Sequence, residues 1–246
     1  MIIGSYSFIF LAPPVFITLF FKNAPYGRYS RNGWGFIVNA KLAWLTQEIP
    51  SLLVAAFLIF SSERPFYRHF SEPGSLLCTC FLVHYSYRSI YFPLMMRGSK
   101  GTPISVWMMS FAFCLINGFL QGWNLSKHAP TVWRFHHFVG LALWLFGWIN
   151  VVVADRILRN LRKPGEIGVY RVPQGGLFRY VSAANYCSEV IEWSGFAIAC
   201  ASFPSTAFAL FTFCNLAPRA IEHHKYYLQK IEDYPKDRKA FIPFLW

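Results

Sequence analysis

The residues of this sequence that are best suited to chemistry lie inside stretches that are otherwise apolar. Gln47 and Glu48 interrupt one stretch, and His84, Tyr85 and Arg88 interrupt another. His84 and Tyr85 precede Arg88 by four and three residues, so these side chains share one side of a helix. A tyrosine hydroxyl donates hydrogen bonds, and a glutamate does so when it is protonated. Such donors can stabilise negative charge that develops on a substrate oxygen.

A second set of polar residues lies in the C-terminal half. Asn185, Glu189 and Glu192 occupy positions i, i+4 and i+7, which form one stripe on a helix. Asp155 and Arg162 are seven residues apart and are predicted to share a helical face. Buried ionisable groups can simply pair and hold helices together. Because several apolar stretches carry them, we favour a shared polar cavity inside the protein.

The composition predicts that membrane-spanning helices position these residues. Of 246 residues, 55% are hydrophobic and 14% are charged, whereas soluble domains average about 25% charged. Residues 2–21, 103–123 and 138–154 contain no charged side chain, and a helix needs about 20 apolar residues to cross a bilayer. The first stretch lacks a basic n-region and contains Pro13-Pro14. We therefore predict a retained span rather than a signal peptide.

The predicted fold class is an all-α integral membrane protein, a seven-transmembrane-helix bundle that forms one domain over residues 1–246. We place the spans at about 2–21, 36–60, 74–96, 103–123, 135–154, 180–202 and 204–218, with a break before Pro204. Lysines and arginines between the spans divide 17 to 4 between the two sides. The positive-inside rule then places the C-terminus in the cytoplasm and the N-terminus outside. The same rule explains the net charge of +12, so we predict no nucleic-acid binding.

Several classes of site are not supported by the sequence. All six cysteines lie in apolar stretches, which indicates buried side chains rather than a disulfide or zinc framework. A di-iron hydroxylase needs ligands at helical spacing, but the pairs His136-His137 and His223-His224 are not part of an H-x-x-H-H or H-x-x-x-H box. We expect no metal. The glycine motifs of Rossmann and Walker A sites and the G-x-S-x-G elbow are also missing.

Read in order, the polar runs carry a family resemblance. They are AWLTQEIPS at 43–51, HYSYR at 84–88, RKPGE at 162–166, YRVPQGGLF at 170–178 and EDYPKDRKAFIPF at 232–244. With this order and spacing, the chain from about residue 24 to its C-terminus resembles the steroid 5α-reductases. The resemblance implies a seven-helix membrane reductase that uses NADPH to reduce the 4,5 double bond of a 3-oxo-4-ene steroid.

The resemblance also implies roles for particular residues around the substrate. The catalytic pair falls on Glu48 and Tyr85, with Trp44 and Gln47 beside the substrate. Hydride would add to C5, and charge would develop on the C3 oxygen. Donors aimed at that oxygen would stabilise the transition state more than the ground state. Burial favours a neutral carboxyl group, which would allow Glu48 to donate.

The NADPH site is implied to lie inside the bundle. Its residues fall on Arg88, Asp155, Arg162, Tyr170, Arg171, Asn185, Glu189, Arg219, His223 and Tyr227. Arginine suits bidentate phosphate binding better than lysine does.

The chain departs from the family pattern at two positions. A family asparagine falls on Val151, with Asn150 one position earlier, so a small shift of the helix would be needed; a family arginine is Ser99.

Other functions remain open from the sequence. They are a reductase of another hydrophobic enone or enoyl lipid, a membrane methyltransferase of similar architecture, and a non-enzymatic sterol carrier or receptor. The membrane can be a bacterial inner membrane or the endoplasmic reticulum. The expected partners are the steroid or related enone and membrane lipid, and we expect a monomer.

Overall fold

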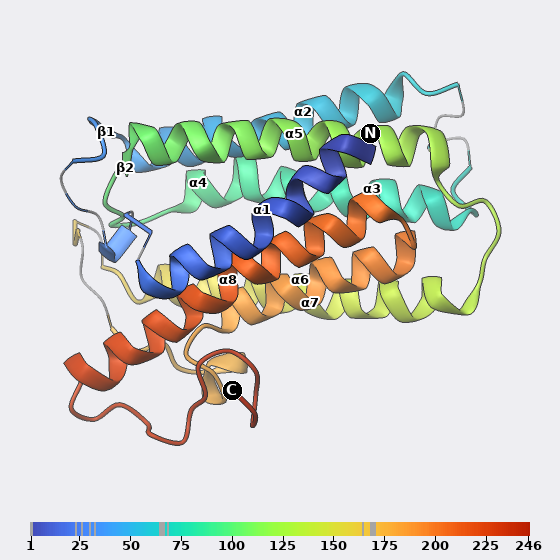
Figure 1. Ribbon diagram of the computed structural model, residues 1–246. Helices are drawn as coiled ribbons and strands as arrows, with labels where there is room; N and C mark the ends of the chain where they lie inside the picture. Colours follow the sequence, from blue (N-terminus) through green and yellow to red (C-terminus); the bar gives the residue numbers. More distant parts are fainter. Residues whose placement is uncertain are drawn as a thin grey trace.

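The computed structural model describes residues 2–22, 24–25, 27–29, 31, 33–63, 67, 69–163, 165–167 and 171–246. Within these residues the chain runs up and down through an elongated bundle of helices (Figure 1). The longer helices are α1 (Ile2–Phe21), α2 (Ala40–Phe60), α3 (Pro73–Ser86), α5 (Ile104–His128), α6 (Phe135–Asn160), α7 (Ala184–Cys200) and α8 (Phe203–Lys230). The predicted all-helical class is confirmed.

The third pass of the chain contains a local change of helix type. The segment η3 (Tyr87–Tyr91) is π-helical and joins α3 directly to α4 (Phe92–Met95), so that the pass is one continuous helix. Such π segments are rare, and they occur frequently at functional sites. Here the segment contains Arg88.

The helices follow the predicted order, with differences at their ends. The second helix begins at Ala40 rather than at residue 36, because the side chain of Asn39 accepts hydrogen bonds from the backbone nitrogens of Lys41 and Leu42. Residues just before it form the short strand β1 (Ile37–Val38), which pairs antiparallel with β2 (Thr102–Pro103).

The last two helices also differ from the prediction. The chain reverses at Ala201, which has a left-handed φ of 46°, and Ser202 caps α8. The expected break before Pro204 is therefore confirmed. The final helix is 28 residues long and continues well beyond residue 218, where we expected it to end. Residues 180–183 precede α7 rather than belonging to it.

Membrane-spanning character is clearest in three helices. Among the described helices, α2, α5 and α6 are long and apolar enough to cross a bilayer, and the apolar part of α1, Ser5–Phe21, is shorter. The expected membrane character of the chain is supported by these helices. The full set of seven spans stays a prediction.

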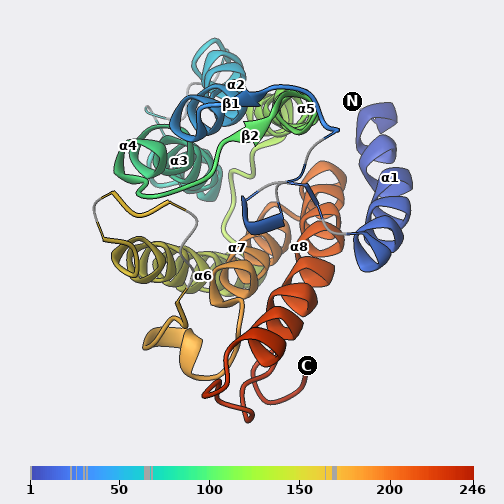
Figure 2. The same ribbon diagram turned by 90° about the vertical axis from the view of Figure 1, so that its left-hand side faces the viewer.

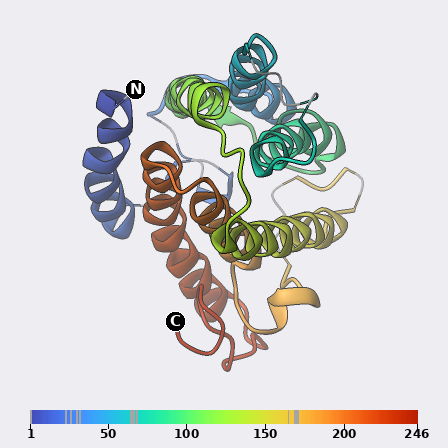
Figure 3. The ribbon, with the colours of Figure 1, turned by 90° about the vertical axis from the view of Figure 1, so that its right-hand side faces the viewer.

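The bundle has two groups of helices. Viewed along its axis, α2, α3 and α5 form one group, α6, α7 and α8 form the other, and α1 lies outside against α8 (Figures 2 and 3). Glycines allow α6 and α7 to approach closely: a Cβ added at Gly147 would clash with the backbone nitrogen of Glu192. Close contact through small residues is typical of helix packing in membranes.

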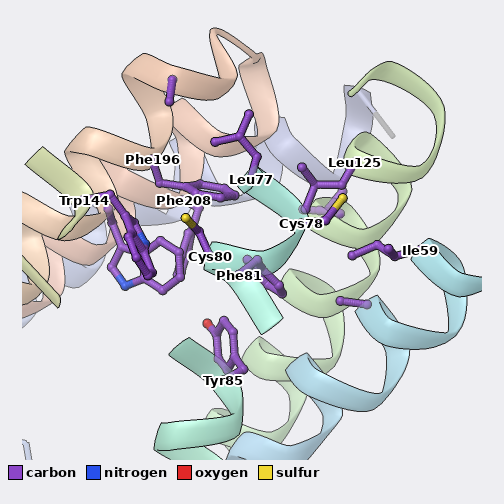
Figure 4. Packing of buried hydrophobic residues seen from close by; sticks show 14 of the residues in the cluster. Ile59, Leu77, Cys78, Cys80, Phe81, Tyr85, Leu125, Trp144, Phe196 and Phe208 are labelled. Carbon is purple, nitrogen blue, oxygen red and sulfur yellow. The ribbon is translucent and has the colours of Figure 1, made fainter. Parts of the chain in front are cut away.

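Buried aromatic side chains connect the two groups. Phe81 and Tyr85 of α3 pack with Trp193 and Phe196 of α7 and with Phe208 of α8 in one cluster, part of which is drawn in Figure 4. The centroids of the Phe81 and Tyr85 rings are 4.7 Å apart. Tyr85 is thus held at the junction between the two groups.

The connecting segments with most of the basic residues share one end of the bundle. The connections α1–α2, α4–α5 and α6–α7, together with the chain after α8, lie at the end where β1 and β2 are found (Figures 1 and 2). The start of α1 lies toward the other end (Figure 1). The basic residues of these segments therefore gather at one end of the bundle.

Candidate active site

Arg88 contacts predicted site residues from three other helices. Its Nη1 atom lies 3.5 Å from Oδ2 of Asp155 on α6, and its Nη2 atom lies 3.8 Å from Oε2 of Glu189 on α7. The guanidinium group also lies over the rings of Trp44 and Phe92, 5.0 and 4.8 Å from their centroids. One cation therefore connects α2, the third pass, α6 and α7.

Glu48 and Tyr85 approach each other from α2 and α3, against α5. The Tyr85 hydroxyl accepts a hydrogen bond from Nδ2 of Asn117 at 2.8 Å, and Oε2 of Glu48 lies 3.6 Å from Sγ of Cys114. The two groups are near enough to interact electrostatically, and Glu48 also interacts with Arg88. Through Glu48, the predicted catalytic pair is thus connected electrostatically to the Arg88 cluster.

The two glutamates of the predicted α7 stripe, Glu189 and Glu192, have different partners. Glu189 faces Arg88, but Oε1 of Glu192 lies 2.6 Å from Nδ1 of His84, and both of these side chains are buried. The His84 ring also packs against Trp193, with centroids 4.4 Å apart. Oε2 of Glu192 has no hydrogen-bond partner within the described part of the chain.

Gln47 is buried beside Glu48 with an unsatisfied acceptor. Its Oε1 atom makes no hydrogen bond to any described residue. Buried polar atoms are nearly always hydrogen-bonded, so an unpaired one suggests a ligand or water at that position. Trp44, one turn before Glu48 on α2, packs on Arg88, so both residues predicted to lie beside the substrate are on the same helix as Glu48.

A second cluster lies on α8 and involves a residue that the sequence analysis missed. The Arg219 Nη2 atom donates to the hydroxyl of Tyr186 at 2.6 Å, and that hydroxyl lies 3.4 Å from Nε2 of His223. Tyr186 follows Asn185, a half-buried residue in the first turn of α7. A signal for Tyr186 was present, because it lies in the polar run that includes Asn185.

Tyr227 belongs to a different environment. It is buried and stacks on Tyr234 of the C-terminal tail, with centroids 5.1 Å apart. Tyr234 in turn contacts Ser182, whose hydroxyl lies 2.6 Å from both Tyr234 Oη and His224 Nδ1. Tyr227 thus packs the tail against α8, and Tyr234 connects the same part of the tail to the segment before α7.

The basic residues of the α6–α7 connection lie at the surface. Arg162 Nη1 donates to the carbonyl of Arg97 at 2.8 Å. Both terminal nitrogens of Arg171 pair with the carboxylate of Glu166 at 2.7 Å. Hydrogen bonds from Arg171, then the backbone nitrogen of Lys163, lower the pKa of Glu166 to about 2. Tyr170 lies outside the described residues.

One geometric expectation about this segment is wrong. Asp155 and Arg162 do not share a helical face, because α6 ends at Asn160 and Arg162 lies in the turn that follows. Asp155 faces Arg88 inside the bundle, whereas Arg162 is bonded at the surface. A Pro-Gly pair at 164–165 favours the end of the helix at this point.

The two departures from the family pattern also have clear positions. The side chain of Asn150 donates to the carbonyl of Phe146, one turn earlier, at 2.8 Å, and Val151 is buried. The helix is continuous there, so the shift that would exchange these positions does not occur. The Ser99 hydroxyl donates to the carbonyl of Lys100 at 3.2 Å and is exposed.

The sequence analysis also missed other buried polar residues, three of which make notable contacts. Asn117 and Gln121 lie on α5 within the stretch that we described only as uncharged, and both are 0% exposed. Their spacing of four residues was a usable signal. Arg238 is buried in the tail, where it donates to the carbonyl of Pro173 at 2.9 Å and to Oε1 of Gln174 at 2.7 Å.

The arrangement can perform a limited range of chemistry. It offers a tyrosine hydroxyl and a carboxyl group that interact electrostatically, together with a cation held by carboxylates. It suits the polarisation of one polar atom on a hydrophobic ligand. Among the described residues, no group of three or more histidine, cysteine, aspartate or glutamate side chains could hold a metal ion.

Comparisons with known proteins identify close relatives. A family model described as 3-oxo-5-alpha-steroid 4-dehydrogenase matches residues 100–246. A Bos taurus protein named 3-oxo-5-alpha-steroid 4-dehydrogenase 1 is 46% identical over 236 residues, which cover 94% of this chain and 91% of that protein. Its Homo sapiens counterpart is also 46% identical, over 91% of this chain and 87% of its own length.

A plant protein is also similar to this chain. The Gossypium hirsutum protein named steroid 5-alpha-reductase DET2 is 41% identical over 250 residues, which cover 96% of this chain and 93% of that protein. Glu48 and Tyr85 precede the region matched by the family model. They lie well inside the length matched by these relatives, because so little of the chain is left uncovered.

Proposed function

The chain belongs to the 3-oxo-5-alpha-steroid 4-dehydrogenase family, and on this premise we propose that it reduces 3-oxo-4-ene steroids with NADPH through Glu48 and Tyr85. It is an oxidoreductase that acts on a CH–CH group, the 4,5 bond of the steroid. The observation that carries the proposal is the identity of 40–46% with named steroid reductases over most of the chain.

The proposed chemistry assigns the two donors to one oxygen. Tyr85 and a protonated Glu48 donate hydrogen bonds to the C3 carbonyl oxygen of the steroid, where negative charge develops as C5 is reduced. NADPH would supply the hydride when bound, and a proton from water would complete the reduction at C4. The aromatic ring of Trp44 and the amide of Gln47 orient the steroid beside the pair. Two observations support this role: Trp44 lies one helical turn before Glu48 on α2, and Oε1 of Gln47 has no hydrogen-bond partner among the described residues.

A second set of residues fits a charged cofactor. Asp155 and Glu189 hold Arg88 inside the bundle, and Glu48 interacts with the same cation. Arg219, with His223 and Tyr186, offers a cation at the basic end of the bundle, and the surface residues Arg162 and Arg171 add two more. A dinucleotide with phosphate groups requires such cations, and arginine binds phosphate oxygens bidentately. We assign Asn185 to the same site; Tyr170 and Tyr227 remain candidates from the family resemblance.

The membrane arrangement is part of the same proposal. The chain forms a seven-span domain whose basic end faces the cytoplasm, where NADPH is available, and it acts as a monomer. Support comes from the four basic segments that share one end of the bundle.

The direct test is a product assay. Purified protein in detergent or nanodiscs would be incubated with NADPH and testosterone or progesterone, and the product analysed by mass spectrometry after chromatography against 5α and 5β standards. We expect a gain of two hydrogens on the steroid, with the 5α configuration. No conversion of either steroid, in a preparation that still binds NADPH, would contradict the proposed substrate class.

A further inference from the structure

A line of buried amides connects Tyr85 to the start of α8. Asn117 Nδ2 donates to the Tyr85 hydroxyl at 2.8 Å, and Gln121 Nε2 lies 3.4 Å from Oδ1 of Asn117. Gln121 Nε2 also donates to the carbonyl oxygen of Pro204 at 3.0 Å. Both amide side chains are 0% exposed, so water does not compete for these bonds.

The Pro204 carbonyl, at the end of the line away from Tyr85, determines which group donates in each hydrogen bond. The Pro204 carbonyl can only accept, so the group of Gln121 that faces it must be the NH₂. That NH₂ then donates to Asn117, which must present its oxygen to Gln121 and its own NH₂ to Tyr85. A rotated Gln121 amide would place two oxygens against each other. This orientation leaves one buried acceptor unsatisfied, because Oε1 of Gln121 has no hydrogen-bond partner in the described part of the chain.

The direction has a consequence for the Tyr85 proton. Since Asn117 donates to the Tyr85 oxygen, the hydroxyl hydrogen must point elsewhere. Ser51 also lies near this hydroxyl, but its own proton is donated to the carbonyl of Cys114 at 2.8 Å. In the absence of substrate, the Ser51 oxygen can therefore accept the hydroxyl proton of Tyr85. Ser51 has no further proton to donate, so it does not require the Tyr85 oxygen as an acceptor.

We propose that Asn117 and Gln121 are positioning residues that orient the Tyr85 hydroxyl as a donor toward the substrate carbonyl. The inference rests on the proposed role of Tyr85. A hydroxyl that could rotate freely would spend part of its time as an acceptor, which does not help a carbonyl oxygen. A donor fixed before the reaction does not have to reorient when charge develops.

The test is a double-mutant cycle between Asn117 and Tyr85. Asn117→Leu removes the donor with little change in volume, and it is made in the wild type and in Tyr85→Phe. Product is measured by mass spectrometry, with long incubations for the slower variants. In the wild type, we expect kcat to fall about tenfold, the size of one hydrogen bond, with a smaller change in the KM for the steroid. In Tyr85→Phe, the same substitution should change kcat less than about twofold.

A matched control lies on the same helix. Asn124 is also buried, and its Nδ2 atom donates to Ser202 Oγ at 3.0 Å, outside the line that ends at Tyr85. Asn124→Leu should lower thermal stability without the coupling to Tyr85→Phe. If Asn117→Leu does not fold, Gln121→Met interrupts the line farther from Tyr85 and should give a smaller loss of kcat with the same coupling.

The outcomes separate this inference from the proposed function. Equal losses in both backgrounds, or no loss in the wild-type background, would overturn the positioning role and leave Tyr85 as the donor. If Tyr85→Phe alone retains the wild-type kcat, the catalytic assignment of Tyr85 itself is wrong, and the positioning role fails with it.

Discussion

The guanidinium of Arg88 lies 3.5 Å from the carboxylate of Asp155, which joins the third pass of the chain to α6. Both side chains are largely buried, and Glu189 approaches the same guanidinium from α7. Because removal of one partner leaves a buried charge uncompensated, this contact should matter for folding as well as for the cofactor.

Arg88→Met should therefore lower both stability and NADPH affinity. Loss of one partner of a buried ion pair costs roughly 3–5 kcal/mol, and we expect less here because Glu189 is partly exposed. Adding Asp155→Asn should restore part of the stability but not the affinity. Thermal unfolding and NADPH titration would be measured on the same preparations. Lys225→Ala, which removes an exposed pair with Glu222, is the control. Full recovery of affinity in the double variant would mean that Arg88 is structural only.

The surface arginines should affect the cofactor more than the steroid. Arg162→Ala or Arg171→Ala should weaken NADPH binding about tenfold or more, since each would remove a charge-assisted contact to phosphate. The wild type should strongly prefer NADPH to NADH. Arg156→Ala changes an exposed arginine at the same end and should have little effect. Unchanged NADPH affinity in both variants would show that Arg162 and Arg171 do not bind the cofactor, and that they only set the membrane orientation and hold the local loop structure.

The catalytic pair predicts a graded loss of turnover. Removing one donor of an oxyanion site typically costs about 10²–10³ in kcat. Tyr85→Phe and Glu48→Ala should lose activity of this order, while Glu48→Gln keeps an N–H donor and should lose less. NADPH should still bind to all three. Wild-type turnover by Glu48→Ala would refute the mechanism, and loss of NADPH binding in Glu48→Gln would instead indicate a structural partner of Arg88.

The buried contact between His84 and Glu192 predicts a stability effect without a catalytic one. His84→Leu leaves the Glu192 carboxyl group without its partner, so the unfolding temperature should fall sharply. The double variant His84→Leu/Glu192→Met replaces both groups by apolar ones and should recover much of the loss. Thermal melts in detergent would show this. A double variant less stable than the single one would mean that the pair stabilises the fold by more than the hydrogen bond each group provides to the other.

The distribution of basic residues predicts the topology. With 17 lysines and arginines on one side and 4 on the other, the C-terminus should be cytoplasmic and the N-terminus outside. Reporter fusions at each end would decide the matter. Finding both ends on one side would require an even number of spans.

Much of the fold was predictable from the sequence, because hydrophobic stretches and turn residues act locally. Apolar stretches of sufficient length predicted the helices in order, and Pro204 marked the last reversal. The ends were less predictable: Asn39 caps α2 through its own side chain, and α6 ends before Arg162. The polar residues of the site were recognisable by type, since charged groups in apolar stretches are costly.

Partners across the bundle were decided by tertiary structure. The sequence places Glu189 and Glu192 on one stripe, yet one faces Arg88 and the other His84. This choice depends on how α6, α7 and the third pass approach each other, and Gly147 brings the α6 backbone directly against Glu192. The line from Pro204 to Tyr85 likewise joins residues far apart in the chain. Hydrogen bonds act over a few ångströms, so only the packed bundle determines which donor meets which acceptor.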